Sequence, residues 1–272
     1  KKGYDKDGAK GSVRDYFIEQ SGGQYTPQFD IYGPITVSKE WEYYPSNDYT
    51  GTDSKIPSGN RVYDMIVEAC TQLDDDIDFS KYDEDGDGDI DFIYALYAGY
   101  GYSSAYMGIW PHHSSGKHYS TTKGRLVTEK EKEEWVKKKA LAKFDGKYFT
   151  MYSCSNEMRP GVTRTGIGTT VHETSHHLGL PDYYDTDGWD NYGKKNITLP
   201  YKYSLMSSGS HTNNGINPPN YSIYDKYYMG WLTPKVLKDD GNYVLEPGEG
   251  YCITRNGKLA TATRQDTVYY IE

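Results

Sequence analysis

The sequence has few of the residues that usually build a protein core or a covalent framework. Leu, Ile, Val and Phe together make up 44 of the 272 residues, and there are only 3 cysteines. A combined fraction of Leu, Ile, Val and Phe below ~20% is typical of disordered chains when the net charge is also high. Here the net charge is −9, and 30 Tyr and 5 Trp supply apolar surface. We therefore expect a folded, Tyr-rich globular protein with one large domain or two small ones.

Long apolar runs and basic runs are also missing. No stretch approaches the ~18 consecutive apolar residues of a membrane-spanning helix. A net charge of −9 without a Lys- or Arg-rich tract argues against nucleic acid as a partner. The chain begins at Lys1 without Met or an apolar leader, and it ends within a predicted strand. We expect a mature or excised part of a longer protein, so the missing leader does not bear on export.

The three cysteines, Cys70, Cys154 and Cys252, are too few for a complete disulfide framework. Two alternatives stay open, one disulfide with a free thiol or three buried thiols. None of the three has the spacing of zinc ligands. The cysteines therefore do not decide the redox compartment.

Hydrophobic periodicity and turn signals divide the chain into helices and strands. Helices are predicted over 11–20, 61–73 and 129–144, strands over 92–97 and 148–152, and short β-prone runs over 29–44. From about residue 235 the pattern changes to short β segments around Pro-Gly and Asn-Gly turns. We therefore predict one domain over 1–234, followed by the start of a β-rich segment over 235–272.

The most informative stretch is VHETSHHLGLPD at residues 171–182. His172 and His176 are four residues apart on one face of a predicted helix, so both imidazoles can bind one metal ion. Glu173 is adjacent to the first His and can reach a metal-bound water without being a ligand. His177 points about 100° away and is expected outside the ligand set. Two solvated or core histidines are the alternative, which the combined Glu, Gly and Asp spacing disfavours.

A catalytic zinc needs a third protein ligand and one open position. No Glu follows the motif until Glu246, so a Glu ligand from a second helix is unfavourable. A helix break at Gly179 with a ligand six residues beyond His176 gives Asp182 instead. Asp185 is the reserve candidate for the same role.

Further stretches accompany this motif: YSLMSSGS at 203–210, PPNYSIYDKYYMGWLTP at 218–234, DFSKYDEDGDGDIDFIYALYAG at 78–99 and IWPH at 109–112. Together with HETSHHLGLPDYYDTDG, they resemble the immune inhibitor A family of secreted bacterial zinc metallopeptidases, from about residue 11 to 235. The resemblance implies an α+β, metzincin-like fold with a mixed sheet and an active-site helix. It also implies that Met206 forms the Met-turn, an apolar floor beneath the zinc ligands. Ser208 stands where many metzincins have Tyr, so the residue that steadies the oxyanion is left open.

A second metal site is indicated by DEDGDGDID at 83–91. Asp at loop positions 1, 3 and 5 with Gly at 6 matches a calcium loop, but position 12 is Tyr94 and a strand follows. The loop is therefore not an EF-hand, and Asp91 or Asp78 replaces the missing carboxylate. The predicted calcium ligands are Asp83, Asp85, Asp87, Asp89 and Asp91, with a solvated acidic turn as the alternative. Another cation site or solvated loop is formed by Asp185, Asp187 and Asp190.

These residues predict a secreted bacterial zinc endopeptidase that acts on proteins or peptides. Zinc is held by His172, His176 and Asp182, and Glu173 is the general base. The alternative from another class is a non-catalytic adhesion or binding module stabilised by calcium and zinc, which an intact Glu173 disfavours. A peptidoglycan amide as substrate and a sugar-binding role for the Tyr residues are further alternatives. We expect a monomer, without nucleic acid or a membrane span.

Overall fold

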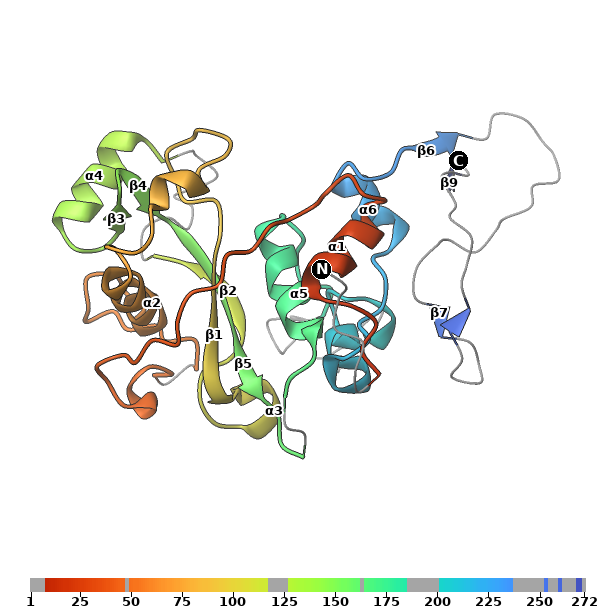
Figure 1. Ribbon diagram of the computed structural model, residues 1–272, viewed down its shortest axis with the longest axis horizontal. Helices are drawn as coiled ribbons and strands as arrows, with labels where there is room; N and C mark the ends of the chain where they lie inside the picture. Colours follow the sequence, from red (N-terminus) through yellow and green to blue (C-terminus); the bar gives the residue numbers. More distant parts are fainter. Residues whose placement is uncertain are drawn as a thin grey trace, which may run out of the picture. The chain divides into compact units, whose positions relative to one another are not determined.

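The computed structural model describes residues 8–46, 49–116, 127–161, 164–184 and 201–236, with three short strands between 252 and 270. The chain is a mixture of helices and strands (Figure 1). Contacts within it define two compact units. We call Asp30–Thr165 the sheet unit and Lys1–Phe29 with Gly166–Glu272 the helical unit. In the described part of the chain, no helix is long and apolar enough to cross a membrane.

The sheet unit contains a three-stranded mixed sheet. Strand β1 (Ile93–Tyr100) is parallel to the central strand β5 (Met151–Met158), and β2 (His112–Ser115) pairs antiparallel with the other edge of β5. The predicted mixed sheet is therefore confirmed. The predicted strand that starts near Phe92 is also present, as β1.

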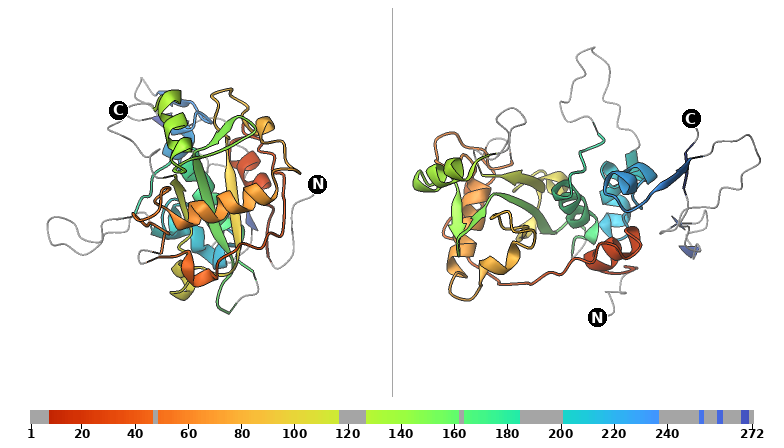
Figure 2. Two further views of the ribbon diagram at one scale, coloured as in Figure 1. Left: turned by 90° about the vertical axis from the view of Figure 1, so that its left-hand side faces the viewer. Right: turned by 90° about the horizontal axis from the view of Figure 1, so that it is seen from above.

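Helix α2 (Arg61–Gln72) lies against this sheet (Figure 2), as its apolar spacing predicts. Asn60 caps it, because Asn60 Oδ1 accepts from the amides of Val62 at 2.9 Å and Tyr63 at 3.0 Å. The Asn60 Nδ2 group also donates to the Tyr152 hydroxyl on β5 at 2.7 Å. One side chain thus starts the helix and ties it to the sheet.

The helix predicted over 129–144 is wrong in its C-terminal half. Helix α4 (Glu129–Lys137) ends early, because Lys139 adopts a positive φ of 55°. The amide of Ala140 then bonds to the Trp135 carbonyl at 2.9 Å, which closes the last turn. The helical periodicity of the sequence therefore continues past the point where the backbone leaves the helix.

The remaining residues form an antiparallel hairpin of β3 (Ala142–Phe144) and β4 (Lys147–Phe149). Asp145 and Gly146 both have positive φ, 47° and 82°, as a two-residue type I′ turn requires. This Asp-Gly turn is what ends the helical pattern. The strand predicted over 148–152 is divided between β4 and β5.

Three short elements complete the sheet unit: η1 (Trp41–Tyr43), η2 (Phe79–Tyr82) and α3 (Tyr102–Ala105). The β-prone runs predicted over 29–44 form no strand, because this segment has no hydrogen-bonded partner strand among the described residues. β-branched and aromatic residues there favour an extended backbone without a ladder.

The helical unit is built around α5 (Ile167–His177), which α1 (Val13–Gln20) contacts (Figure 1). The N-terminus of α1 agrees with the prediction, since Ser12 and Asp15 form a capping box. Gln20 joins α1 to a distant segment, because it donates to Asn220 Oδ1 at 2.9 Å and accepts from the Tyr221 amide at 3.1 Å. Short helices η3 (Tyr201–Tyr203), η4 (Ser208–Gly215) and α6 (Ile223–Tyr228) follow. The buried core of this unit consists of Tyr16, Phe17, Val171, Leu180, Leu205, Met206 and Tyr221.

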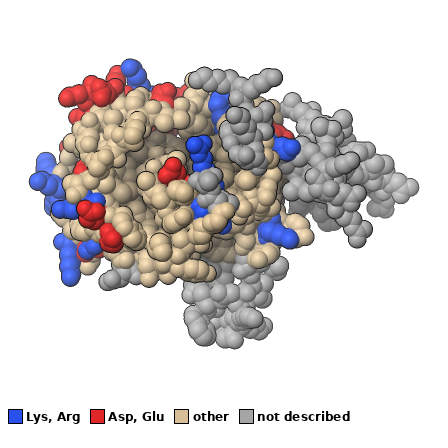
Figure 3. All heavy atoms as spheres, turned by 60° about the horizontal axis from the view of Figure 1, so that its bottom comes forward, with Lys and Arg blue, Asp and Glu red and all other residues tan. Residues whose placement is uncertain are grey.

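The described residues after 233 form two strand pairs, β6 (Pro234–Val236) with β9 (Val268–Tyr270) and β7 (Cys252–Ile253) with β8 (Leu259–Ala260). The domain boundary at 234, the β-rich C-terminal segment and the metzincin details of the fold stay predictions. On the face drawn in Figure 3, most of the described surface is uncharged, and acidic and basic side chains stand in small groups.

Cys70 and Cys154 are both buried, and they do not form a disulfide with each other. Burial raises the pKa of the Cys70 thiol to about 12, which makes it unreactive at neutral pH. The side chain of Cys252 lies outside the described residues.

Candidate active site

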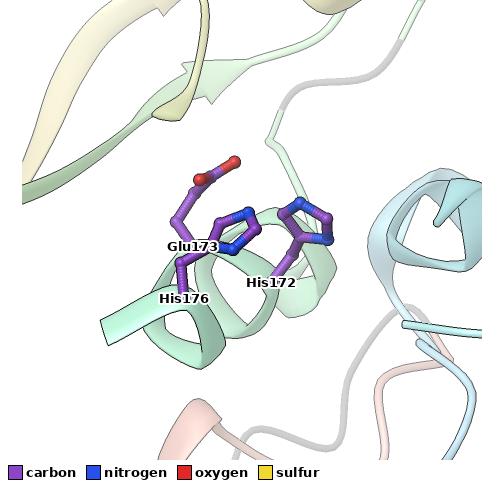
Figure 4. Close-up of side chains that lie close together, drawn as sticks. All are labelled: His172, Glu173 and His176. Carbon is purple, nitrogen blue, oxygen red and sulfur yellow. The ribbon is translucent and has the colours of Figure 1, made fainter. Parts of the chain in front are cut away.

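Helix α5 carries the predicted metal motif, and the main chain of η4 lies very close to its first turn. Gly168 permits this approach, since a Cβ atom there would lie 2.1 Å from the Ser210 carbonyl oxygen. His172 is one turn further along α5, and His176 one turn beyond that. Figure 4 shows both imidazoles and Glu173 projecting from the same side of the helix.

The two imidazoles are oriented by main-chain carbonyls. His172 Nδ1 lies 2.8 Å from the Leu205 oxygen, and His176 Nδ1 lies 2.8 Å from the Leu180 oxygen. A carbonyl oxygen only accepts hydrogen bonds, so each Nδ1 carries the proton and donates. Each Nε2 therefore presents a lone pair, which is the arrangement of a metal-binding histidine.

Asp182 completes this group beyond the end of the helix. Its Oδ1 atom lies 3.2 Å from His172 Nε2 and 3.3 Å from His176 Nε2. This oxygen is buried and has no hydrogen-bond partner among the described residues. Three acceptors facing one another repel unless a cation or a proton lies between them. Ligands at ~2.0–2.2 Å from a tetrahedral zinc are about 3.3 Å apart, so these residues fit a zinc ion.

The charges of the group shift its pKa values in opposite directions. Burial by itself would lower the pKa of His172, but the Asp182 carboxylate, the charge of Glu173 and the Leu205 carbonyl together raise it. Burial would raise the pKa of Asp182, and the two histidines beside it lower it well below the usual range. Protons and a cation therefore compete for the same place.

Glu173 lies beside the group as a buried carboxylate with 5% exposure. One ligand atom each of His172, Glu173 and His176 lies within 4.8 Å of the others. A buried carboxylate next to two imidazoles is a candidate general base.

Met206, the residue predicted for the Met-turn, is fully buried and belongs to the same core cluster as Val171 of α5. Its carbonyl accepts from the Tyr183 amide at 2.7 Å. The preceding carbonyl, of Leu205, is the one that accepts from His172. The turn thus contacts both sides of the candidate metal group, and its role as an apolar floor stays a prediction.

Tyr184 is a residue that the sequence analysis missed. Its ring is nearly parallel to His172, with an angle of 15° and centroids 6.5 Å apart. Burial, followed by the charge of Asp182, raises the pKa of Tyr184, so its phenol keeps its proton and can donate a hydrogen bond. Only its place two residues after Asp182 could have marked it, among 30 Tyr in the chain.

The other predicted residues of this region do not join the group. His177 is partly buried on α5, and burial lowers its pKa, so it is neutral. The reserve ligand and the third acidic cluster, Asp185, Asp187 and Asp190, lie outside the described residues.

In the sheet unit, the acidic turn brings together three of the five predicted calcium ligands. Carboxylate oxygens of Asp83, Asp85 and Asp91 lie within 4.8 Å of one another. Asp83 Oδ2 accepts from Lys147 at 2.5 Å, whereas its Oδ1 is buried and has no hydrogen-bond partner in the described chain. Burial, followed by the charges of Asp85 and Asp83, raises the pKa of Asp91.

The carboxylates of Asp87, Asp89 and Asp78 are not part of this group of three. Asp87 Oδ1 accepts from the Asp89 amide at 2.8 Å, and the Asp89 side chain pairs with the buried Lys132. Asp78 accepts from the Ser80 amide at 3.2 Å. The structure therefore does not bring these three together with the others.

Comparisons with known proteins agree with the resemblance seen in the sequence. A family model described as the catalytic domain of immune inhibitor A peptidase M6 matches residues 1–232. Immune inhibitor A of Bacillus thuringiensis subsp. alesti is 30% identical over 248 residues, which cover 82% of this chain and 32% of that protein. The pre-pro-metalloprotease PrtV of Vibrio cholerae serotype O1 (strain M66-2) is 26% identical over 240 residues, 80% of this chain and 23% of that protein. The chain thus spans about a third or less of the length of these relatives.

Proposed function

Since this chain belongs to the immune inhibitor A peptidase M6 family, we propose that it is the catalytic domain of a secreted bacterial zinc endopeptidase. One observation carries the choice of zinc: two Nε2 lone pairs and Asp182 Oδ1 converge at 3.2 and 3.3 Å. Two neutral imidazoles and one carboxylate are a ligand set found in catalytic zinc sites. Secretion is supported by the family resemblance and by the acidic turn, since weak calcium loops fill at extracellular calcium concentrations.

His172, His176 and Asp182 are the residues that would hold the metal. Bound zinc would lower the pKa of a water molecule and polarise the scissile carbonyl. Glu173 accepts the proton of that water and later delivers it to the leaving amine nitrogen. The low exposure of Glu173 excludes bulk water from this proton transfer.

The test separates the base from the ligands. Glu173→Gln should retain one zinc per chain, because Glu173 is not a ligand, and should lose casein hydrolysis by a factor of about 100 to 10,000. Zinc is measured by mass spectrometry and hydrolysis by peptide release. Glu19→Gln, at an exposed position of α1, is the matched control and should behave as the parent. Hydrolysis at the parent rate by Glu173→Gln would contradict the mechanism.

The alternative, a non-catalytic binding module, is not favoured. Such a module has no use for a buried carboxylate between two histidines, and the matched family and the relative PrtV carry the names of peptidases. A chelator of zinc that leaves casein hydrolysis unchanged would reopen this alternative.

We further propose a structural calcium ion at Asp83, Asp85 and Asp91. The Asp83 side chain is fully buried, at 0% exposure, and its Oδ1 atom has no hydrogen-bond partner among the described residues. Burial, followed by the charges of Asp85 and Asp83, raises the pKa of Asp91. A cation would supply the interaction that Asp83 Oδ1 lacks and would reduce the repulsion among the three carboxylates.

A further inference from the structure

We propose that Asp225 of α6 is a positioning residue that fixes the third zinc ligand, Asp182, by way of Tyr183. The inference rests on the proposed function, in which Asp182 binds the metal. It assigns a role to a buried carboxylate that takes no part in the proton transfer.

Asp225 belongs to the first turn of α6 and has 0% exposure. Its Oδ2 atom accepts from the Ser222 amide at 2.8 Å, and its own amide donates to Ser222 Oγ at 3.1 Å. This is a capping box, which is normally formed at a surface. A buried carboxylate is costly unless both of its oxygens are bonded, and the cap occupies only Oδ2.

The Tyr183 hydroxyl is the partner of the other oxygen. It donates to Asp225 Oδ1 at 2.5 Å. An ionised carboxylate oxygen only accepts hydrogen bonds, so the phenol is the donor. A hydrogen bond from a neutral donor to a buried carboxylate is among the stronger ones in proteins.

Tyr183 is fixed at its backbone as well as at its hydroxyl. Its amide donates to the Met206 carbonyl at 2.7 Å, and the adjacent Leu205 carbonyl accepts from His172 Nδ1 at 2.8 Å. The peptide between Asp182 and Tyr183 is therefore attached to the same turn that orients the first histidine. This attachment fixes the backbone from which the Asp182 side chain extends toward the two histidines.

The third ligand needs such an attachment because no helix positions it. His172 and His176 are placed by α5, but Asp182 follows Gly179, which has a φ of 94°, in a segment without regular secondary structure. A ligand on a segment with more conformational freedom loses entropy when it binds the metal. Removing the groups that orient a metal ligand typically weakens metal binding 10- to 100-fold.

The experiment compares Tyr183→Phe with Ser222→Ala in the full chain. Tyr183→Phe removes the hydroxyl alone, and we expect the zinc Kd, measured by competition with a chromophoric chelator, to rise about 10- to 100-fold. Ser222→Ala removes half of the capping box and keeps the bond between Tyr183 and Asp225. It should lower Tm in the zinc-stripped protein and leave the zinc Kd within about threefold of the parent.

A second variant is needed if Tyr183→Phe does not fold because the buried Asp225 carboxylate has lost its hydrogen bond. The double variant Tyr183→Phe with Asp225→Asn removes that charge and should show the same loss of zinc affinity. If the parent binds zinc, either of two results would overturn the inference. One is an unchanged zinc Kd in the double variant. The other is a loss of zinc affinity that is proportional to the loss of Tm in every variant, Ser222→Ala included. A parent chain that binds no zinc would overturn the proposed function together with it.

Discussion

Gly168 gives the sharpest test of how α5 is placed. A Cβ atom at this position would lie 2.1 Å from the Ser210 carbonyl oxygen and 3.1 Å from the Gly215 Cα. In an ordinary helix, alanine is more favourable than glycine by about 1 kcal/mol. Here the neighbouring main chain of η4 occupies the space, so we expect Gly168→Ala to destabilise the protein.

The magnitude follows from the overlap. A carbon and a carbonyl oxygen in contact are roughly 3.3 Å apart, so α5 and η4 must separate by about 1 Å at this point. Because the obstacle is main chain, no side-chain rotation relieves it, and the cost is ~3 kcal/mol, the upper end for overpacking. After the gain in helix propensity, the net loss is about 2 kcal/mol. That corresponds to a Tm lower by about 4–8 °C in a chain of this size.

The same displacement reaches the candidate metal group. His172 lies four residues after Gly168 on the same face of α5, and its Nδ1 depends on the Leu205 carbonyl at 2.8 Å. A misplacement of about 1 Å costs on the order of 100-fold in rate. Casein hydrolysis by Gly168→Ala should therefore fall even at temperatures where the protein is folded.

Thermal unfolding followed by circular dichroism and kcat/KM for a casein peptide measure the two effects. Thr170→Ala, at a partly exposed position of the same helix, is the control and should leave Tm unchanged or slightly raised. A Gly168→Ala protein that melts at or above the parent temperature would refute the close approach of α5 to η4.

Three further predictions concern the metal sites. Asp182→Ala should lose both zinc and hydrolysis, whereas Asp185→Ala should keep zinc; the reverse result in metal analysis would make Asp185 the third ligand. Calcium should stabilise calcium-stripped protein by about 2.7 kcal/mol at a hundredfold excess over Kd, and Asp85→Ala should abolish this rise in Tm with zinc still bound. A Tm that does not respond to calcium would leave a solvated acidic turn. In zinc-stripped protein, the raised pKa of His172 contributes stability that is present below its ordinary value of 6.5 and is lost as pH rises through the folded value. The lowered pKa of Asp182 contributes stability that is present above 3.8 and is lost as pH falls through the folded value. Melting curves from pH 5 to 9 should therefore show a weaker decline toward alkaline pH for Asp182→Asn than for the parent, and identical profiles would contradict this origin.

The part of the candidate site that the sequence predicts consists of residues that lie close together in the chain. His172 and His176 follow from the helical period, and Asp182 follows from the break at Gly179 and its distance past the second histidine. The sequence does not predict that Asp225 accepts a hydrogen bond from Tyr183, because the two residues are 42 positions apart and come together only in the folded chain. No local pattern connects two such residues.

The error in the predicted helix and the arrangement of the acidic turn have separate physical causes. The helical spacing after Trp135 is real, but the Asp145-Gly146 turn and the buried hairpin determine the backbone there. In the acidic turn, regular Asp spacing cannot reveal that Asp89 pairs with Lys132 from α4. The first case is a competition between two local signals, whereas the second depends on a contact between residues 43 positions apart.

The order of synthesis acts differently on the two units. Residues of the sheet unit are consecutive, so this unit can fold as soon as Thr165 has left the ribosome. The helical unit must wait, because Gln20 bonds to Asn220 and to the Tyr221 amide across 200 and 201 residues of chain. Closing so long a loop is slow compared with forming local contacts. The unit that carries the candidate metal group can therefore close only after Tyr221 has been translated, later than the sheet unit.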